Sequence, residues 1–200
     1  MPIRCGPGFK EHRRGQKVIL RRITMRRIVR VIAFSLMAGA ALAAVGAASG
    51  QEASLYGNAA AKVDDLLTTE DMLLYAAQDE YLARGEYLAI QKKFGALRPF
   101  SNIMRAEENH LAWLKDAFAA SGLSFPVDAS GAYIQVPVTL LDAYKAGVQA
   151  EIDNIAMYDR FLDTALIQNP ENKDLKILFT NLRNASENHL RAFQNQLTKY

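Results

Sequence analysis

Two short copies of one pattern hold the side chains of this sequence that are best suited to chemistry. The first copy is residues 106–111, in which Glu107 and His110 stand three positions apart, and the second is residues 185–190. The copies differ at one position, where Ser186 replaces the counterpart of Glu107. On a helix, the Glu-x-x-His spacing places the carboxylate and the imidazole on one face, as in carboxylate-bridged metal sites.

Five polar residues in all interrupt helical patterns that are otherwise apolar. An ionised carboxylate is costly to bury without a partner, and three carboxylates in one core would repel one another and take up protons. A divalent cation removes this conflict, and carboxylate oxygens with imidazole nitrogens suit iron, manganese or zinc. The sequence therefore predicts a metal site formed by Glu80, Glu107, His110, Glu151 and His189.

Two tyrosines accompany these carboxylates. Glu80 is followed two helical turns later by Tyr87, and Glu151 is followed at the same spacing by Tyr158. Each phenol therefore lies on the same helical face as its carboxylate. Both can donate hydrogen bonds to metal ligands. Core packing is the simpler role of both rings.

The five candidate ligands also have a simpler explanation. A single Glu in an apolar pattern is often half exposed at a helix end, and a single His is more often a hydrogen-bonded core residue than a ligand. Ser186 limits the metal hypothesis, because a hydroxyl is a poor ligand for these ions. The two hypotheses are therefore a core that binds one or two metal ions and a metal-free helical module, structural or partner-binding, in the cell envelope.

Four amphipathic helices must position these residues. A capping box at Thr68 and Asp71 begins the first helix, and Gly95 ends it. Residues 121–136 have no helical period and can span about 50 Å at about 3.3 Å per residue. Short links within pairs and a long link between them predict an all-α, ferritin-like four-helix bundle with a long crossover between helices 2 and 3. The apolar residues recur at helical spacing over 73–94, 100–117, 141–165 and 175–193.

Charge divides the chain into two parts. Residues 1–50 carry ten of the 24 Lys and Arg and one acid, Glu11, so residues 51–200 hold 14 basic and 20 acidic residues, a net charge of −6. This acidic remainder argues against a nucleic-acid partner. Basic residues followed by an apolar run over 31–48 predict a secretory signal peptide, and therefore export to the periplasm or the cell exterior. The alternative is an uncleaved membrane anchor, and membrane contact is expected only through this segment.

These features divide the chain into three regions. Residues 1–48 are the N-terminal extension and signal peptide, 49–67 a linker, and 68–200 the helical domain; translation can start at Met1 or Met25. The only cysteine, Cys5, precedes the signal, so the exported domain has neither disulfides nor thiolate ligands. The sequence also lacks a Gly-rich phosphate loop, a Gly-x-Ser-x-Gly motif and a zinc-binding cysteine pair.

Three blocks of sequence resemble a known family. Residues 80–84, the Glu107-x-x-His110 pair and residues 186–193 look like a bacterial and archaeal family of ferritin-like domains without an assigned function. The likeness covers roughly residues 68–197. It implies a relative of the rubrerythrin and ferritin superfamily, in which matching carboxylates and histidines bind two metal ions and react with oxygen or peroxide. The departure from that pattern is Ser186, which stands where the fourth helix would supply a carboxylate.

The resemblance also implies a role for each candidate residue. Glu80 would be a terminal carboxylate, Glu107 and Glu151 bridging or chelating carboxylates, and His110 and His189 the imidazole ligands. We therefore expect an exported protein with one or two Fe, Mn or Zn ions in its core. An oxidoreductase that oxidises Fe(II) or reduces oxygen or peroxide is the further hypothesis, and the sequence leaves a homo-oligomer open.

Overall fold

The computed structural model describes residues 55–200, and over this range the chain is helical, without β-strands. The all-α prediction is confirmed, whereas the predicted signal peptide lies outside the described residues. Within residues 55–200, no helix combines the length and the apolar character needed to cross a bilayer. The helices are α1 (Asn58–Val63), α2 (Thr69–Phe94), α3 (Phe100–Ala120), α4 (Leu140–Leu162), α5 (Ala165–Gln168) and α6 (Lys173–Leu197), with 3-10 turns at Ser130–Ala132 and Pro170–Asn172.

Hydrogen-bonded caps explain where two long helices begin. The Thr68 hydroxyl accepts from the backbone N–H of Asp71 at 3.1 Å, and the Asp71 carboxylate accepts from the Thr68 N–H at 3.0 Å, which confirms the predicted capping box. Thr139 caps α4 similarly, accepting from the N–H of Asp142 at 3.1 Å. Helix α2 ends at Gly95, whose φ of 94° a residue with a Cβ rarely adopts.

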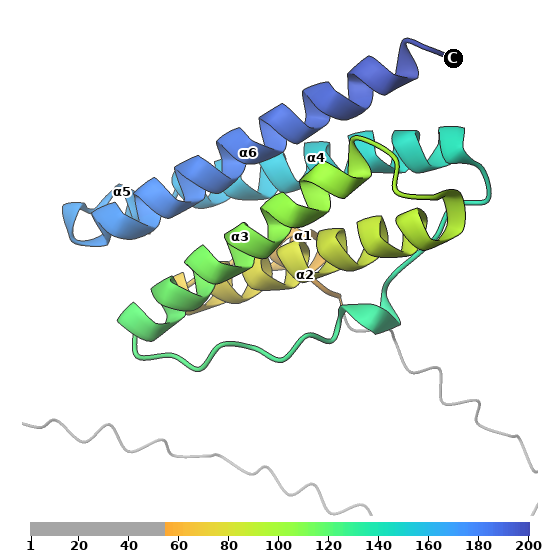
Figure 1. The fold of residues 1–200 in the computed structure, drawn as a ribbon. Helices are drawn as coiled ribbons and strands as arrows, with labels where there is room; N and C mark the ends of the chain where they lie inside the picture. Colours follow the sequence, from red (N-terminus) through yellow and green to blue (C-terminus); the bar gives the residue numbers. More distant parts are fainter. Residues whose placement is uncertain (1–54) are drawn as a thin grey trace, which may run out of the picture. The chain divides into compact units, whose positions relative to one another are not determined.

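The long helices are arranged as two neighbouring pairs, α2 with α3 and α4 with α6 (Figure 1). After α3, residues 121–139 run back along α2 before α4 begins (Figure 1). This connection passes so close to Gly85 that a Cβ there would lie 2.7 Å from a methyl carbon of Ile134. The Lys93 ammonium donates to the Pro137 carbonyl at 2.7 Å, which holds the start of α4 near the end of α2. Helix α4 therefore runs antiparallel to α2.

The structure differs from the sequence prediction in the linker and around the connection between α4 and α6. Helix α1 forms within 49–67, where we predicted only a linker. Helix α4 ends at Leu162 rather than near residue 165, because Thr164 adopts an extended conformation and its hydroxyl caps the separate helix α5. Asn169 caps the 3-10 turn that precedes α6, and α6 begins at Lys173, just before the predicted helical period over 175–193.

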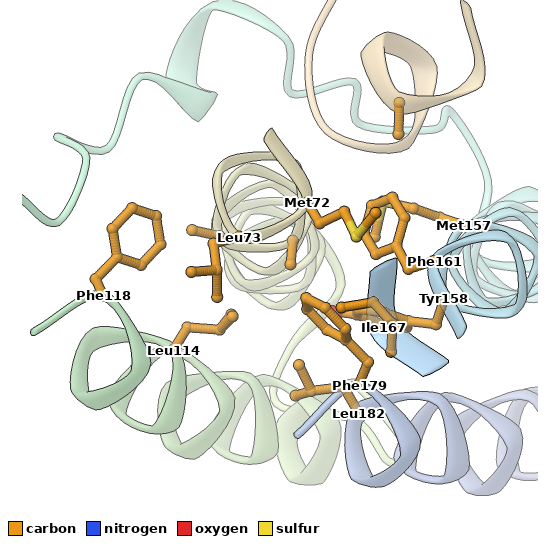
Figure 2. Packing of buried hydrophobic residues seen from close by; sticks show 13 residues of the cluster. Met72, Leu73, Leu114, Phe118, Met157, Tyr158, Phe161, Ile167, Phe179 and Leu182 are labelled. Atoms are coloured by element: carbon orange, nitrogen blue, oxygen red, sulfur yellow. The ribbon is translucent and has the colours of Figure 1, made fainter. Parts of the chain in front are cut away.

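The buried apolar side chains form two clusters. In all four long helices, the buried polar residues lie in sequence between the residues of one cluster and those of the other, so we call them the polar layer. The polar layer consists of Asp79, Glu80, Glu107, His110, Glu151, Asn154, Ser186 and His189. The first cluster, which includes α1 and α5, contains Met72, Leu73, Leu114, Phe118, Met157, Tyr158, Phe161, Ile167, Phe179 and Leu182 (Figure 2). The second contains Tyr87, Ile90, Phe100, Ile103, Ala143, Tyr144 and Phe193.

A buried carboxylate attaches α1 to the polar layer. One oxygen of Asp79 accepts from the backbone N–H of Asn58 at 2.9 Å and from its side-chain amide at 2.7 Å. The other oxygen accepts from the Asn154 amide at 2.6 Å. Gly57 allows this close approach, because a Cβ there would lie 2.6 Å from the Asp79 carboxylate. Helix α1 has only six residues, too few to be stable alone, so it depends on such contacts.

We expect Asp79→Ala to loosen α1 selectively. The substitution removes the acceptor for two hydrogen bonds from Asn58, each with a net contribution of about 1 kcal/mol, so amide exchange over Asn58–Val63 should accelerate at least about tenfold. Hydrogen-exchange mass spectrometry measures this change, and Asp65→Ala, which alters an exposed acid beyond α1, is the matched control. Unchanged exchange in α1 would show that Asp79 does not hold it.

Candidate metal centre

The five side chains predicted as ligands lie together in the polar layer. They come from all four long helices: Glu80 from α2, Glu107 and His110 from α3, Glu151 from α4, and His189 from α6. Each is buried, with between 2% and 8% of its surface exposed. The fold therefore brings all five into the core, from four separate helices.

Glu107 is the central residue of this group. One of its oxygens lies 2.7 Å from Nδ1 of His110, and the other lies 3.2 Å from Nδ1 of His189. Glu80 approaches the first imidazole to 3.0 Å, and Glu151 approaches the second to 3.6 Å. Two sets of three residues, each with ligand atoms within 4.8 Å of one another, thus share Glu107. The arrangement provides two adjacent positions for cations, each with two carboxylates and one imidazole.

The turn between α2 and α3 brings the carboxylates to one level. Glu80 lies about four helical turns before the end of α2, whereas Glu107 lies only about two turns after the start of α3, which suggests different depths. The turn removes this difference, because it sets Phe100 level with Tyr87, with ring centroids 5.8 Å apart. Glu80 lies about two helical turns before Tyr87 along α2, and Glu107 lies about two helical turns after Phe100 along α3.

The two tyrosines donate hydrogen bonds to carboxylates, but across the pairs of helices. The Tyr87 hydroxyl on α2 donates to Glu151 on α4 at 2.7 Å, and the Tyr158 hydroxyl on α4 donates to Glu80 on α2 at 2.7 Å. Burial and the neighbouring carboxylates raise the pKa of both phenols well above their usual range, so they remain protonated donors. These crossed hydrogen bonds fix the outer two carboxylates.

The charges in this group shift one another's pKa values. Burial, and then the proximity of Glu107, raises the pKa of Glu80 to about 7. Burial opposes ionisation of Glu107 too, but its close polar contacts with Glu80, His110 and His189 lower its pKa. Burial likewise opposes charge on the imidazoles, yet the surrounding carboxylates raise the pKa of His110 and of His189 to about 10. Protons or metal ions can therefore balance the buried negative charge.

One buried nitrogen of the group has close polar neighbours but no hydrogen bond. Nδ1 of His189 is buried and has no hydrogen-bond partner, although it faces oxygens of Glu107 and Glu151. When this imidazole loses its proton, Nδ1 presents a lone pair, and a buried polar atom normally has a partner. Mixed carboxylate and imidazole donors suit Fe, Mn or Zn.

Sequence reasoning missed the part of the polar layer that surrounds Ser186. The Ser186 hydroxyl donates to the side-chain oxygen Oδ1 of Asn154 at 2.9 Å, and the side-chain amide nitrogen of Asn154 donates to Asp79. Aligning α2 with α4 so that Glu80 matches Glu151 would have revealed Asn154 on the same face. Glu187 does not replace the absent carboxylate, because it pairs with Arg183 at 2.8 Å.

A cavity of about 30 Å³ lies between α2 and α4 and reaches the candidate ligands. This volume can hold about two water molecules. Its lining includes the carboxylates Glu107 and Glu151, the small residues Ala83 and Ala150, and Asn154. A small molecule in the cavity would therefore touch both carboxylates of the second position.

We expect Tyr158→Phe to destabilise the protein. The change leaves a buried oxygen of Glu80 without its hydroxyl donor, and an unsatisfied buried acceptor costs about 1–3 kcal/mol. The free energy of unfolding in urea measures the loss. Tyr75→Phe is the matched control, because its hydroxyl donates to Asp64 outside the polar layer, and it should cost less. Equal losses in the two variants would contradict a special role for Tyr158.

Comparison with known proteins relates the chain to proteins that are themselves uncharacterised. It is 29% identical over 143 residues to uncharacterized protein MJ0754 of Methanocaldococcus jannaschii, across 64% of this chain and 74% of the relative. The crystal structure of hypothetical protein MJ0754 from Methanococcus jannaschii DSM 2661 matches 68% of this chain and 85% of that chain, with a TM-score of 0.56 and 25% identity. The family model described as uncharacterized protein domain DUF2202 matches residues 69–200, and the chain therefore belongs to the DUF2202 family.

Proposed function

We propose that this protein is a ferritin-like four-helix bundle whose polar layer binds one or two transition-metal ions, Fe, Mn or Zn. The observation that carries the proposal is the position of Glu107, whose two oxygens face two different imidazoles. A carboxylate in this position is suited to bridging two cations. The ferritin-like part of the proposal rests on two helix pairs joined by a connection that returns along α2.

Each residue has a defined role in this proposal. Glu80 and Glu151 bind as terminal carboxylates, and their hydrogen bonds from Tyr158 and Tyr87 keep an oxygen oriented toward the centre. His110 and His189 bind through Nδ1, the atom that faces the carboxylates in both residues. The apolar clusters keep bulk water away from the polar layer, which strengthens these interactions. A bound ion would supply Lewis acidity or one-electron chemistry.

The cavity beside Glu107 and Glu151 favours an oxidoreductase as the second candidate function. Its volume of about 30 Å³ admits a molecule with two heavy atoms, such as oxygen or peroxide. The activity would be oxidation of Fe(II) or reduction of one of these molecules. Aerobic Fe(II) oxidation faster than in buffer supports this function, and oxidation at the buffer rate despite bound iron contradicts it.

Export is a further part of the proposal, and a metal-free module is the hypothesis opposed to it. The basic and apolar pattern of residues 1–48 supports export to the periplasm or the cell exterior. The opposing hypothesis is a metal-free module, in which protons on His110 and His189 balance the carboxylates. Metal binding and its dependence on pH distinguish this hypothesis from the metal centre.

We expect Glu107→Gln to weaken metal binding strongly. The amide keeps the size of the side chain but removes the charge shared by both cation positions, so affinity for Mn(II) or Zn(II) should fall by more than about tenfold. Equilibrium dialysis with elemental analysis measures the bound metal. Glu108→Gln, which changes the adjacent exposed acid, should bind as the unsubstituted protein does. Less than roughly a tenth of an equivalent of metal in the unsubstituted chain would favour the metal-free module.

We expect the metal-free protein to lose stability as the pH rises from about 6.5 to about 10. The folded pKa of His110 and His189, about 10, exceeds the unfolded value of 6.5, so their stabilisation is complete below the unfolded value and disappears as the pH passes the folded value. The pKa of Glu80, which is raised to about 7, also makes the folded protein less stable as the pH rises, over a lower pH range.

Thermal unfolding in a chelator measures this effect. The melting temperature should fall across the pH window, whereas stabilisation by added Mn(II) should increase, because metal ions and protons compete for the same atoms. A melting temperature in chelator that is constant or rises with pH would contradict charged imidazoles in the metal-free state.

A further inference from the structure

The polar layer is built from two matching halves that differ at one group of positions. Helices α2 and α4 match when Glu80 is aligned with Glu151, and the same alignment pairs Tyr87 with Tyr158. Helices α3 and α6 match when the two copies of the Asn-His-Leu sequence are aligned, which pairs His110 with His189. The halves differ where Asp79, Ala83 and Glu107 of the first correspond to Ala150, Asn154 and Ser186 of the second.

These differences compensate for one another in side-chain size. In the first half, the long Glu107 side chain is accompanied by the small Ala83, and in the second half the short Ser186 is accompanied by the larger Asn154. Ser186 donates to Asn154 at 2.9 Å, and Asn154 donates to Asp79 at 2.6 Å. A neutral hydroxyl and amide therefore stand where a fourth carboxylate would, and both polar atoms of Asn154 already have partners.

The two halves consequently supply different numbers of ligands to their own cation positions. The first half supplies Glu80, Glu107 and His110, and the two carboxylate oxygens lie 3.0 and 2.7 Å from the imidazole nitrogen. The second half supplies only Glu151 and His189, 3.6 Å apart, and must share Glu107 with the first. A cation at the second position thus has less negative charge of its own, and its ligand atoms are more widely spaced.

We propose that the Ser186–Asn154 pair, fixed by Asp79, makes the two positions unequal, so that Glu80, Glu107 and His110 hold the tightly bound ion. The second position, at Glu151 and His189, binds an ion weakly and exchangeably. This inference rests on the proposed metal-binding function and deepens it by assigning a relative affinity to each position. Because loss of even a supporting residue typically weakens metal sites 10–100-fold, we expect the second ion to bind at least about tenfold more weakly.

Titration of the full chain with Co(II) tests this assignment. Visible absorption follows coordination, and equilibrium dialysis counts the ions. The unsubstituted chain should bind one Co(II) tightly and a second at least about tenfold more weakly. His110→Ala should remove the tight ion, whereas His189→Ala should leave it and remove the weak one. Two ions of equal affinity, or loss of the tight ion in His189→Ala, would overturn the assignment.

A double substitution tests the role of the polar pair. Asn154→Ala combined with Ser186→Glu gives the second half the counterparts of Ala83 and Glu107, and it should produce two tightly bound Co(II) ions per chain. Asn154→Ala alone opens the same space without a carboxylate, so it should keep one tight ion. A double variant that retains the helical circular dichroism spectrum but still binds one tight ion would refute the role of the pair. No Co(II) binding by the unsubstituted chain would instead reject the proposed function itself.

Discussion

The central constraint on this structure is that charged groups are buried between two apolar clusters. Four carboxylates and two imidazoles lie with at most 8% of their surface exposed, so bulk water does not solvate them. Ions removed from water need partners of opposite charge at short distance, or their pKa values shift until they are neutral. The positions of the four long helices can be understood as the means of bringing these groups within reach of one another.

Aromatic residues carry much of this alignment. The contact between Phe100 and Tyr87 sets the level of α3 against α2, and Tyr158 lies beside Phe179 in the same way where α4 meets α6, with ring centroids 6.0 Å apart. The tyrosine hydroxyls then join the two helix pairs, because each donates to a carboxylate of the other pair. Apolar packing and polar orientation are therefore provided by the same side chains, which ties the stability of the fold to the geometry of the site.

The sequence was informative where periodicity and spacing determine structure. The cap at Thr68 and the stop at Gly95 follow from local pattern and are confirmed, and the same kind of pattern indicated five of the buried polar side chains. Two kinds of feature were beyond that reasoning. The crossed tyrosine hydrogen bonds depend on how the helix pairs face each other, which no local pattern specifies. Helix α1 depends on Asp79, which is distant from Asn58 in sequence, so the α1 segment alone resembled a linker.

Anomalous X-ray scattering from crystals of the full chain grown with Mn(II) tests the central claim most directly. The account predicts a peak in the polar layer at about 2.0–2.2 Å from oxygens of Glu80 and Glu107 and from Nδ1 of His110. Manganese peaks confined to surface acids, with the imidazoles still hydrogen-bonded to the carboxylates, would contradict it. In that case protons, rather than a metal ion, would balance the buried charge.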